Sequence, residues 1–363
     1  MTPARSVERV RELVGGGFDL PDPGAGDTPT RWRTLFLTAR HEDVSVARLV
    51  EAHVDAVSIL HEAGATPVPG AVYGVWASVG PGGRDVAVDE VVRDLDDGAD
   101  EGDDDGRADA AGRAGATGRA DAAGRTGAAG RAGDGGDDVR RVSWPTVSGR
   151  KPFCSGAGTI DRALVDVHDG VRRQMYDVDL TSAATWSVSD AGPAWGTTAL
   201  ADTSTRSVDF DRHPVDPGRR VGEPGWYLSR PGFWHGAAGP AACWAGAAAG
   251  LVDVHAPGDD PHRLARHGAL LAETFALEAL LDAAGRRADA RPDDVVDARR
   301  TALSVRAAVH DAAVRLVEGF SRSVGPRGLT DESVARRVAD TLLYVRQFHA
   351  DHDLVALART GST

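Results

Sequence analysis

The sequence is poor in cysteine, methionine and aromatic residues: it has two Cys and two Met among 363 residues, and aromatic residues make up 6%. Cys154 and Cys243 each stand alone among small and apolar neighbours, with no Cys-x-x-Cys or Cys/His ligand spacing. This pattern predicts packing roles and no zinc site, so we expect no metal. Two isolated cysteines also favour a reducing compartment, which indicates a cytoplasmic protein.

Long apolar runs are also missing. The stretch 236–254 is rich in Ala and Gly and contains Pro240, which is typical of a packed helix and not of a membrane span. The N-terminus lacks the apolar segment of a signal peptide. The formal net charge of −13 excludes phosphate-backbone binding as the main role, because such binding needs clustered Lys and Arg. We therefore expect neither a membrane nor a nucleic-acid partner.

The first part of the chain is predicted to be helical. Residues 5–14 indicate a short helix that three glycines end, and residues 18–31, rich in Pro, Gly and Asp, indicate a loop. Between 43 and 63 the apolar residues recur with a spacing near 3.6 residues, which predicts an amphipathic helix that ends at Gly64.

The middle of the chain changes to short β-prone runs separated by turn signals. The predicted strands are 73–79, 85–92, 140–144, 162–168, 175–180, 185–189 and 206–210, with turns at 148–151, 190–196 and 211–218. Residues 94–138 are acidic at first and then form a loose repeat of Ala, Gly, Arg and Asp. This composition buries too little apolar surface to offset chain entropy, so it predicts a disordered surface insertion.

After Pro231 the pattern is helical to the end. The predicted helices are 234–254, 261–284, 292–322 and 330–358, with Asp293 and Thr330 as N-caps of the last two. The fold class is therefore predicted to be α+β: a helical segment 1–68, a β-domain 69–230 that contains the insertion, and a helical bundle 231–363. No strand–turn–helix carries a G-x-G-x-x-G pattern, so a Rossmann domain is not predicted.

Four strings in this order resemble the acyl-CoA dehydrogenase family. They are ARLVEAHVDAVSILHEAGA, YGVWASV, VSGRKPFCSGAGTIDRALV and TSTRSVDFDRHPVDPGRRVGEPGWYL. The third is similar to the family pattern Leu-x-Gly-x-Lys-x-Trp-x-Thr, and the resemblance covers about residues 35–255. It implies a short N-terminal helical segment, a β-barrel-like middle domain and a C-terminal helical bundle, with FAD bound where the last two meet.

The resemblance implies flavin contacts for four residues in the β-domain. Phe153 stands where the family has the aromatic that packs on the isoalloxazine, and Ser155 where it has a hydroxyl at the reactive edge. A flavin ring suits a flat apolar wall and a short hydrogen-bonding group. Trp76 stands where the family has a Thr, with Ser78 close by. The alternative is an ordinary strand end, with Phe153 packed inward and Ser155 capping a turn.

The family's catalytic Glu is not recognisable in either of its usual places, a late C-terminal loop or the start of the first C-terminal helix. The late segment offers Arg346, His349, His352 and Asp353 instead, and steps of three and four predict that residues 346, 349 and 353 share a helical face. Flavin monooxygenases of the same fold carry a similar Arg, His and His-Asp string, which implies cofactor contact for Arg346 and proton handling by the other three. The alternative is an exposed helix end.

Four further residues lie in the regions that the resemblance associates with the pocket and the cofactor. His235 is either a base or a half-buried structural residue. Arg263, Arg266 and Arg327 stand in the regions where the family binds the FAD pyrophosphate, which needs strong donors.

Three functions stay open. The first is a flavin-dependent oxidoreductase that oxidises an acyl thioester or a similar small substrate, expected to be a homo-oligomer. The second is a flavin-dependent monooxygenase on the same fold. The third is a non-catalytic member that has lost the base and the FAD turn.

Overall fold

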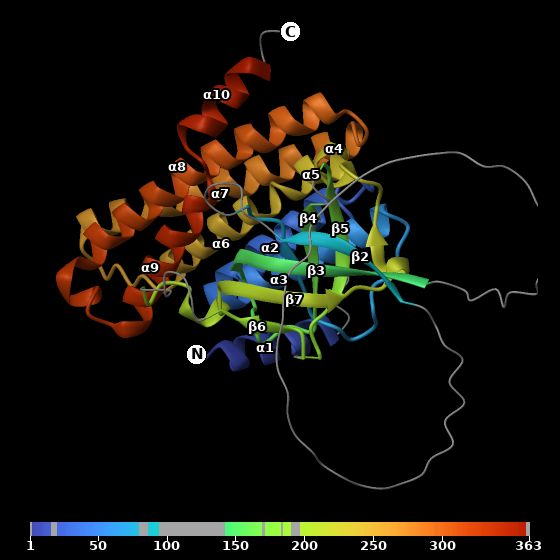
Figure 1. Ribbon diagram of the computed structural model, residues 1–363. Helices are drawn as coiled ribbons and strands as arrows, with labels where there is room; N and C mark the ends of the chain where they lie inside the picture. Colours follow the sequence, from blue (N-terminus) through green and yellow to red (C-terminus); the bar gives the residue numbers. More distant parts are fainter. Residues whose placement is uncertain are drawn as a thin grey trace, which may run out of the picture. The chain divides into compact units, whose positions relative to one another are not determined.

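The computed structural model describes residues 2–15, 20–79, 86–93, 142–168, 171–182, 184–189 and 197–360 (Figure 1). The predicted insertion 94–138 and the predicted turn 190–196 lie outside these residues. The chain divides into two compact units, one of Met1–Glu90 with Pro145–Thr363 and one of Val91–Trp144. In the second unit the described residues are Val91–Arg93 and Val142–Trp144, both extended strand. The candidate site lies in the first unit.

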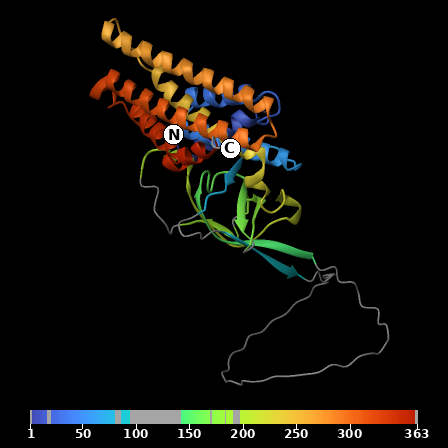
Figure 2. The ribbon, with the colours of Figure 1, turned by 90° about the horizontal axis from the view of Figure 1, so that it is seen from above.

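Helices come before and after the strands in the chain. The order is α1 (Pro3–Gly15), α2 (Thr28–His41), α3 (Val44–Glu62), β1 (Tyr73–Trp76), β2 (Ala87–Arg93), β3 (Val142–Cys154), β4 (Arg162–His168), β5 (Arg173–Asp179), β6 (Trp186–Val188), η2 (Ala201–Thr203), β7 (Arg206–Pro214), η3 (Pro217–Arg219), β8 (Arg220–Val221), α4 (Trp226–Ser229), α5 (Pro231–Gly236), α6 (Gly239–Asp253), α7 (Pro261–Ala290), α8 (Val295–Gly328), α9 (Glu332–Tyr344), η4 (Val345–Gln347) and α10 (Asp351–Thr360), where η marks a 3-10 helix. Figure 2 shows the long helices of the first unit gathered on one side of its strands. The predicted α+β class is confirmed.

Among the described residues, eight strands form one sheet in the order β6-β7-β3-β2-β4-β5-β8, and β1 pairs with β4 beside this path. The β1–β4 pair is parallel, whereas β4–β5 and β3–β7 are antiparallel. The C-terminal half of α3 packs on this sheet through Ala56, Ile59 and Leu60, which contact Tyr73 and Leu164 in one apolar cluster. This contact joins the N-terminal helices to the strands that lead into the candidate site.

The helical part is held together by an unusually close approach of α2 and α6. Helix α6 is rich in Ala and Gly and is buried along most of its length. A Cβ atom at Gly246 would lie 2.0 Å from the carbonyl oxygen of Phe36, and one at Gly250 would lie 2.5 Å from that of Arg40. Only glycine fits at these two contacts, because any side chain there would overlap the backbone of α2. None of the described helices has the length and apolar character that crossing a membrane requires.

Two predicted turns are wrong in part because strands continue through them. Residues 148–151 lie inside β3, where the register with β7 shifts between Val147 and Gly149, and Gly149 has φ 118°. A glycine in that conformation is typical of a β-bulge, so it bends the strand without ending it. In the same way β7 continues to Pro214, with Arg212 at φ 46°, and covers the first half of the predicted turn 211–218.

Several predicted helix boundaries are also wrong, each for a local reason. Helix α2 begins at Thr28, inside the predicted loop 18–31, with a Pro in its first turn. The predicted helix 234–254 divides into α5 and α6, because the Pro of Gly239–Pro240 starts a new helix. The predicted helix 330–358 divides into α9, η4 and α10. The observed N-caps of α8 and α9 are Asp294 and Asp331, each one residue after the predicted Asp293 and Thr330.

Candidate functional site

Phe153 projects into solvent from the end of β3. Its backbone has φ 56°, in the left-handed region, and its side chain is 59% exposed. The next residue, Cys154, is fully buried, and its Sγ lies 3.3 Å from the carbonyl oxygen of Lys151. The left-handed turn therefore directs an aromatic ring outward while its neighbour anchors the strand end. The alternative of an inward-packed Phe153 is wrong.

The hydroxyl of Ser155 ends a short chain of hydroxyl groups. Thr203 donates to the carbonyl of Leu200 (2.7 Å), Thr205 lies 2.7 Å from Thr203, and Ser155 lies 3.0 Å from Thr205. A carbonyl can only accept, so the proton of Thr203 is committed to Leu200. Thr205 then donates to Thr203, and Ser155 to Thr205. The free lone pairs of Ser155 are left as acceptors at the half-exposed end of the chain.

Trp76 supports this strand end from inside the core. It is 1% exposed, and its Nε1 donates to the backbone carbonyl of Ser155 at 3.0 Å. Its contribution is therefore to hold Ser155 in place, and a direct flavin contact by its ring stays a prediction. Ser78 is exposed two residues after β1, and within the described part of the chain no hydrogen bond joins it to Phe153 or Ser155. Its cofactor role also stays a prediction.

The segment between α9 and α10 brings three of the predicted residues together. Nδ1 of His349 lies 3.6 Å, and Nδ1 of His352 lies 3.4 Å, from Oδ1 of Asp353. The imidazoles are 72% and 83% exposed, whereas the Asp353 side chain is 10% exposed. The prediction of a shared helical face is wrong, since α9 ends at Tyr344 and Ala350 has φ 45°. A turn, and not helical periodicity, makes this cluster.

Arg346 lies apart from that cluster, on the 3-10 turn η4. It is exposed, and its Nη1 lies 3.3 Å from Nε2 of His310 in α8. The ring of His310 in turn lies 5.0 Å from that of Phe348. Arg346 therefore helps to fasten the η4 segment to α8, and its predicted contact with a cofactor stays a prediction.

His235 is buried in α5, and its Nε2 lies 3.0 Å from the carbonyl oxygen of Pro292. Because that carbonyl can only accept, Nε2 carries a proton and cannot act as a base in this arrangement. The contact favours the structural alternative for His235, and its catalytic role stays a prediction. His235 also lines a cavity of about 280 Å³ whose walls include Asp22, Ser58 and Glu62.

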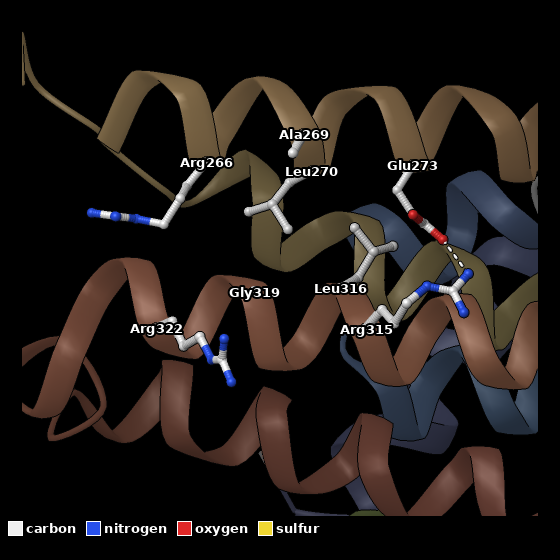
Figure 3. Close-up of a pocket in the computed structure, with 8 residues that line it drawn as sticks. All are labelled: Arg266, Ala269, Leu270, Glu273, Arg315, Leu316, Gly319 and Arg322. Atoms are coloured by element: carbon white, nitrogen blue, oxygen red, sulfur yellow. Dashed lines mark hydrogen bonds and ion pairs between the residues drawn. The ribbon is translucent and has the colours of Figure 1, made fainter. Parts of the chain in front are cut away.

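Arg266 lies at a groove of about 260 Å³ between α7 and α8 (Figure 3). The floor of the groove is apolar, with Leu270 from α7 and Leu316 from α8. Arg315, also at the groove, is paired with Glu273 at 2.6 Å, as the dashed line in Figure 3 shows. A pyrophosphate-binding role for Arg263, Arg266 or Arg327 stays a prediction.

The structure reveals a buried carboxylate that the sequence pattern did not disclose. Glu51 in α3 is 5% exposed, and its Oε2 lies 2.6 Å from Nη1 of Arg48. A Cβ atom at Gly239, the first residue of α6, would lie 3.8 Å from Oε1 of Glu51. Burial raises the pKa of Glu51 to about 7, against the opposing effect of Arg48. An Arg–Glu pair three residues apart within the apolar part of an amphipathic helix was the available signal.

Aromatic rings and a second arginine connect Glu51 to the α9–α10 segment. The Arg48 guanidinium lies 5.9 Å over the ring of Tyr344, which lies edge-on to Trp244 at 6.3 Å. Arg306 lies 4.8 Å over Trp244 and donates to the carbonyls of Ala237 (2.9 Å) and Gln347 (2.6 Å). One continuous set of contacts thus links α3, α6, α8 and η4. Arg306 also interacts electrostatically with Asp353.

No family model matches the chain, and no curated protein matches it by sequence. Solved structures do. TdsC from Paenibacillus sp. A11-2, in complex with FMN and indole, has a TM-score of 0.66 at 15% identity, covering 92% of this chain and 83% of its own. Butyryl-CoA dehydrogenase from Megasphaera elsdenii has a TM-score of 0.62 at 14% identity, covering 90% and 79%. KijD3, in complex with FMN and a dTDP-sugar, has a TM-score of 0.61 at 16% identity, covering 98% and 86%. The chain therefore has the acyl-CoA dehydrogenase fold.

Proposed function

We propose that this chain is a flavin-dependent oxidoreductase that acts on a small organic substrate. The observation that carries the proposal is the end of β3, where Phe153 is held outward by a left-handed backbone and Ser155 presents a hydroxyl close by. An exposed aromatic ring at a strained strand end has no packing role of its own, because it buries little surface. A flat wall with an adjacent hydrogen-bonding group fits an isoalloxazine.

The flavin itself is part of the proposal. The resemblance implies FAD, whereas two of the similar structures contain FMN. Both cofactors fit the same ring contacts at Phe153 and Ser155, since they share the isoalloxazine. Assembly as a homo-oligomer is likewise proposed from the resemblance alone.

The test is titration of the purified full chain with FMN and with FAD, followed by flavin fluorescence and visible absorbance. Phe153→Ala should weaken binding about tenfold, because loss of an aromatic stacking contact costs roughly 1–1.5 kcal/mol. Phe275→Ala is the matched control, since Phe275 is 75% exposed on α7. Failure of both flavins to bind would support the non-catalytic alternative.

For the chemistry, we propose dehydrogenation of an acyl thioester, with Glu51 as the proton acceptor. When bound, the flavin accepts a hydride equivalent. Removal of the neighbouring proton needs a base, and a dry carboxylate with a raised pKa is suited to that task. Glu51, on α3, is such a group, and it lies close to Gly239 at the start of α6, the region where the resemblance places the base of some family members.

Oxygen-dependent monooxygenation is the second candidate, and one observation favours it. Residues 345–350 contain no carboxylate, and His349 and His352 converge on Asp353 directly after them. Imidazole side chains can hold and release protons during such chemistry.

One comparison separates the two reactions. Flavin-loaded protein is mixed anaerobically with acyl thioesters of different chain length, and loss of the visible flavin absorbance is followed. Dehydrogenation predicts bleaching that Glu51→Gln abolishes while flavin binding is kept. Oxygen uptake that needs a supplied reductant, without bleaching by any thioester, would favour the monooxygenase.

A further inference from the structure

We propose that His349, His352 and Asp353 form a binding site for a divalent transition-metal ion of the Zn²⁺ type at the start of α10. One ligand atom from each of these residues lies within 4.8 Å of the other two. Imidazole and carboxylate are established ligands for such ions, and three protein ligands leave the fourth position open. The proposal does not depend on the flavin, and it goes beyond the proposed function.

The spacing of the ligand atoms fits the size of the ion. Zn–N and Zn–O bonds of about 2.0–2.1 Å at tetrahedral angles place neighbouring ligand atoms roughly 3.3 Å apart. The two distances from imidazole nitrogen to Oδ1 of Asp353 are 3.6 Å and 3.4 Å. The three ligand atoms all lie within 4.8 Å of one another, so binding one ion requires rotation of the two exposed imidazoles.

The carboxylate is held in position by contacts that do not use the imidazoles. Oδ2 of Asp353 accepts from the backbone N–H of His349 at 3.2 Å, a contact typical of the start of a helix. The left-handed turn at Ala350 folds His349 back over the first turn of α10. Helix capping therefore accounts for Oδ2, while Oδ1 faces the two solvent-exposed imidazoles.

The charged side chains around His349, His352 and Asp353 are of both signs, so they permit a bound cation without attracting it strongly. Arg306, from α8, lies close enough to interact electrostatically with Asp353. Arg346 on η4 is engaged with His310, and Asp351 is an exposed acid in the first turn of α10. Each His must be neutral to bind a metal, so protons compete with the ion for both imidazoles.

The sequence contains the ligands as His-x-x-His-Asp, but a search for Cys-based spacing does not find them, and the expectation of no metal rests on that search. In a regular helix, residue 349 would lie beside both 352 and 353, but 352 and 353 would diverge by about 100° around the helix axis. The break at residues 348–350 is what brings both imidazoles to the same carboxylate.

The test uses the full chain without flavin, titrated with ZnCl₂ in a calorimeter and with CoCl₂ in a visible spectrophotometer. We expect one ion per chain, and Co²⁺ absorption bands that mark nitrogen and oxygen ligands in a low-coordinate site. His352→Ala should weaken binding about tenfold or more, as should His349→Ala. Both side chains are exposed, so the variants should fold, which circular dichroism checks.

His262→Ala is the matched control, because His262 is an exposed histidine in the first turn of α7. It should bind Zn²⁺ as the unaltered chain does. Absence of a 1:1 binding event, or equal Zn²⁺ affinity in His349→Ala, His352→Ala and the unaltered chain, would overturn the proposal. Because no flavin is present, this result is independent of whether the chain binds one.

Discussion

Phe153 and Glu51 are placed by opposite means. Phe153 is 59% exposed and is held outward by its own backbone, at φ 56°. Glu51 is 5% exposed and is held inward by its neighbours, above all by Arg48. The left-handed backbone at Phe153 places strain in a single residue. The burial of Glu51 places an ionisable carboxylate in an interior that excludes water. The comparison teaches that a change at the strand end should alter binding more than stability, whereas a change in the helical interior should alter stability in a pH-dependent way.

The largest effect should come from removing Arg306, which holds the interior network together. Arg306→Ala leaves the carbonyls of Ala237 and Gln347 without their donor and removes the cation over Trp244. We expect a loss of about 3 kcal/mol in the free energy of unfolding, measured by urea denaturation.

Arg299→Ala is the control for Arg306. Arg299 also lies over a tryptophan, 5.2 Å from Trp234, but it is exposed. Its loss should cost less than about 1 kcal/mol. Equal losses in the two variants would mean that the interior network contributes no more than a surface contact.

Glu51→Gln tests the interior half of this comparison, because its effect on the free energy of unfolding should depend on pH. The pKa of Glu51 is raised from 4.5 to about 7 in the folded chain, so between those values the folded state binds more protons than the unfolded state. The stability that Glu51 contributes is therefore complete below pH 4.5 and is lost as pH rises through about 7. Gln does not ionise, so the variant should gain on the order of 1–3 kcal/mol relative to the unaltered chain between pH 5 and pH 8.

Thermal or urea unfolding at the two pH values measures this difference. Glu223→Gln is the control, because the Glu223 side chain is 79% exposed. A pH-independent difference for Glu51→Gln would mean that Glu51 ionises normally in the folded state. If Glu51 is the base, the rate of substrate oxidation should also rise with pH through about 7, since the ionised form accepts the proton.

The smallest effect on stability should come from Phe153→Gly. Glycine adopts a positive φ without strain, and an exposed Phe loses little packing, so we expect stability to rise by about 0.5 kcal/mol. Flavin affinity should fall about tenfold in the same variant, because the ring contact is lost. The same substitution at Phe275, inside α7, should lower stability by about 1 kcal/mol. A loss of stability in Phe153→Gly would show that the ring packs against the protein.

Much of the fold could be predicted because hydrophobic periodicity acts locally. The strand 162–168 was predicted with its observed bounds, and α3 within one residue at each end. The errors arose where one residue overrode a local pattern: Gly149 turned a predicted turn into a bulge, and Ala350 broke a predicted helix. Such outcomes depend on which partner strand or helix is available, and this information is not local.

The candidate site was only half predictable for the same reason. Phe153 and Ser155 follow each other in one motif, so a resemblance finds both. Glu51 and Gly239 are far apart in the chain, and only the packing of α3 against α6 brings them together. The hydroxyl chain from Leu200 to Ser155 likewise needs η2 to lie against the end of β3.

The sequence by itself determined the α+β class, with helices before and after the strands in chain order. It also determined the aromatic residue Phe153 and the hydroxyl residue Ser155 at the end of β3. The tertiary structure decided the environments: an outward Phe153, a dry Glu51, and imidazoles gathered on Asp353. The physical reason is that hydrophobic period and turn chemistry act over a few residues, whereas burial, pKa and metal-ligand geometry depend on atoms that only folding brings close.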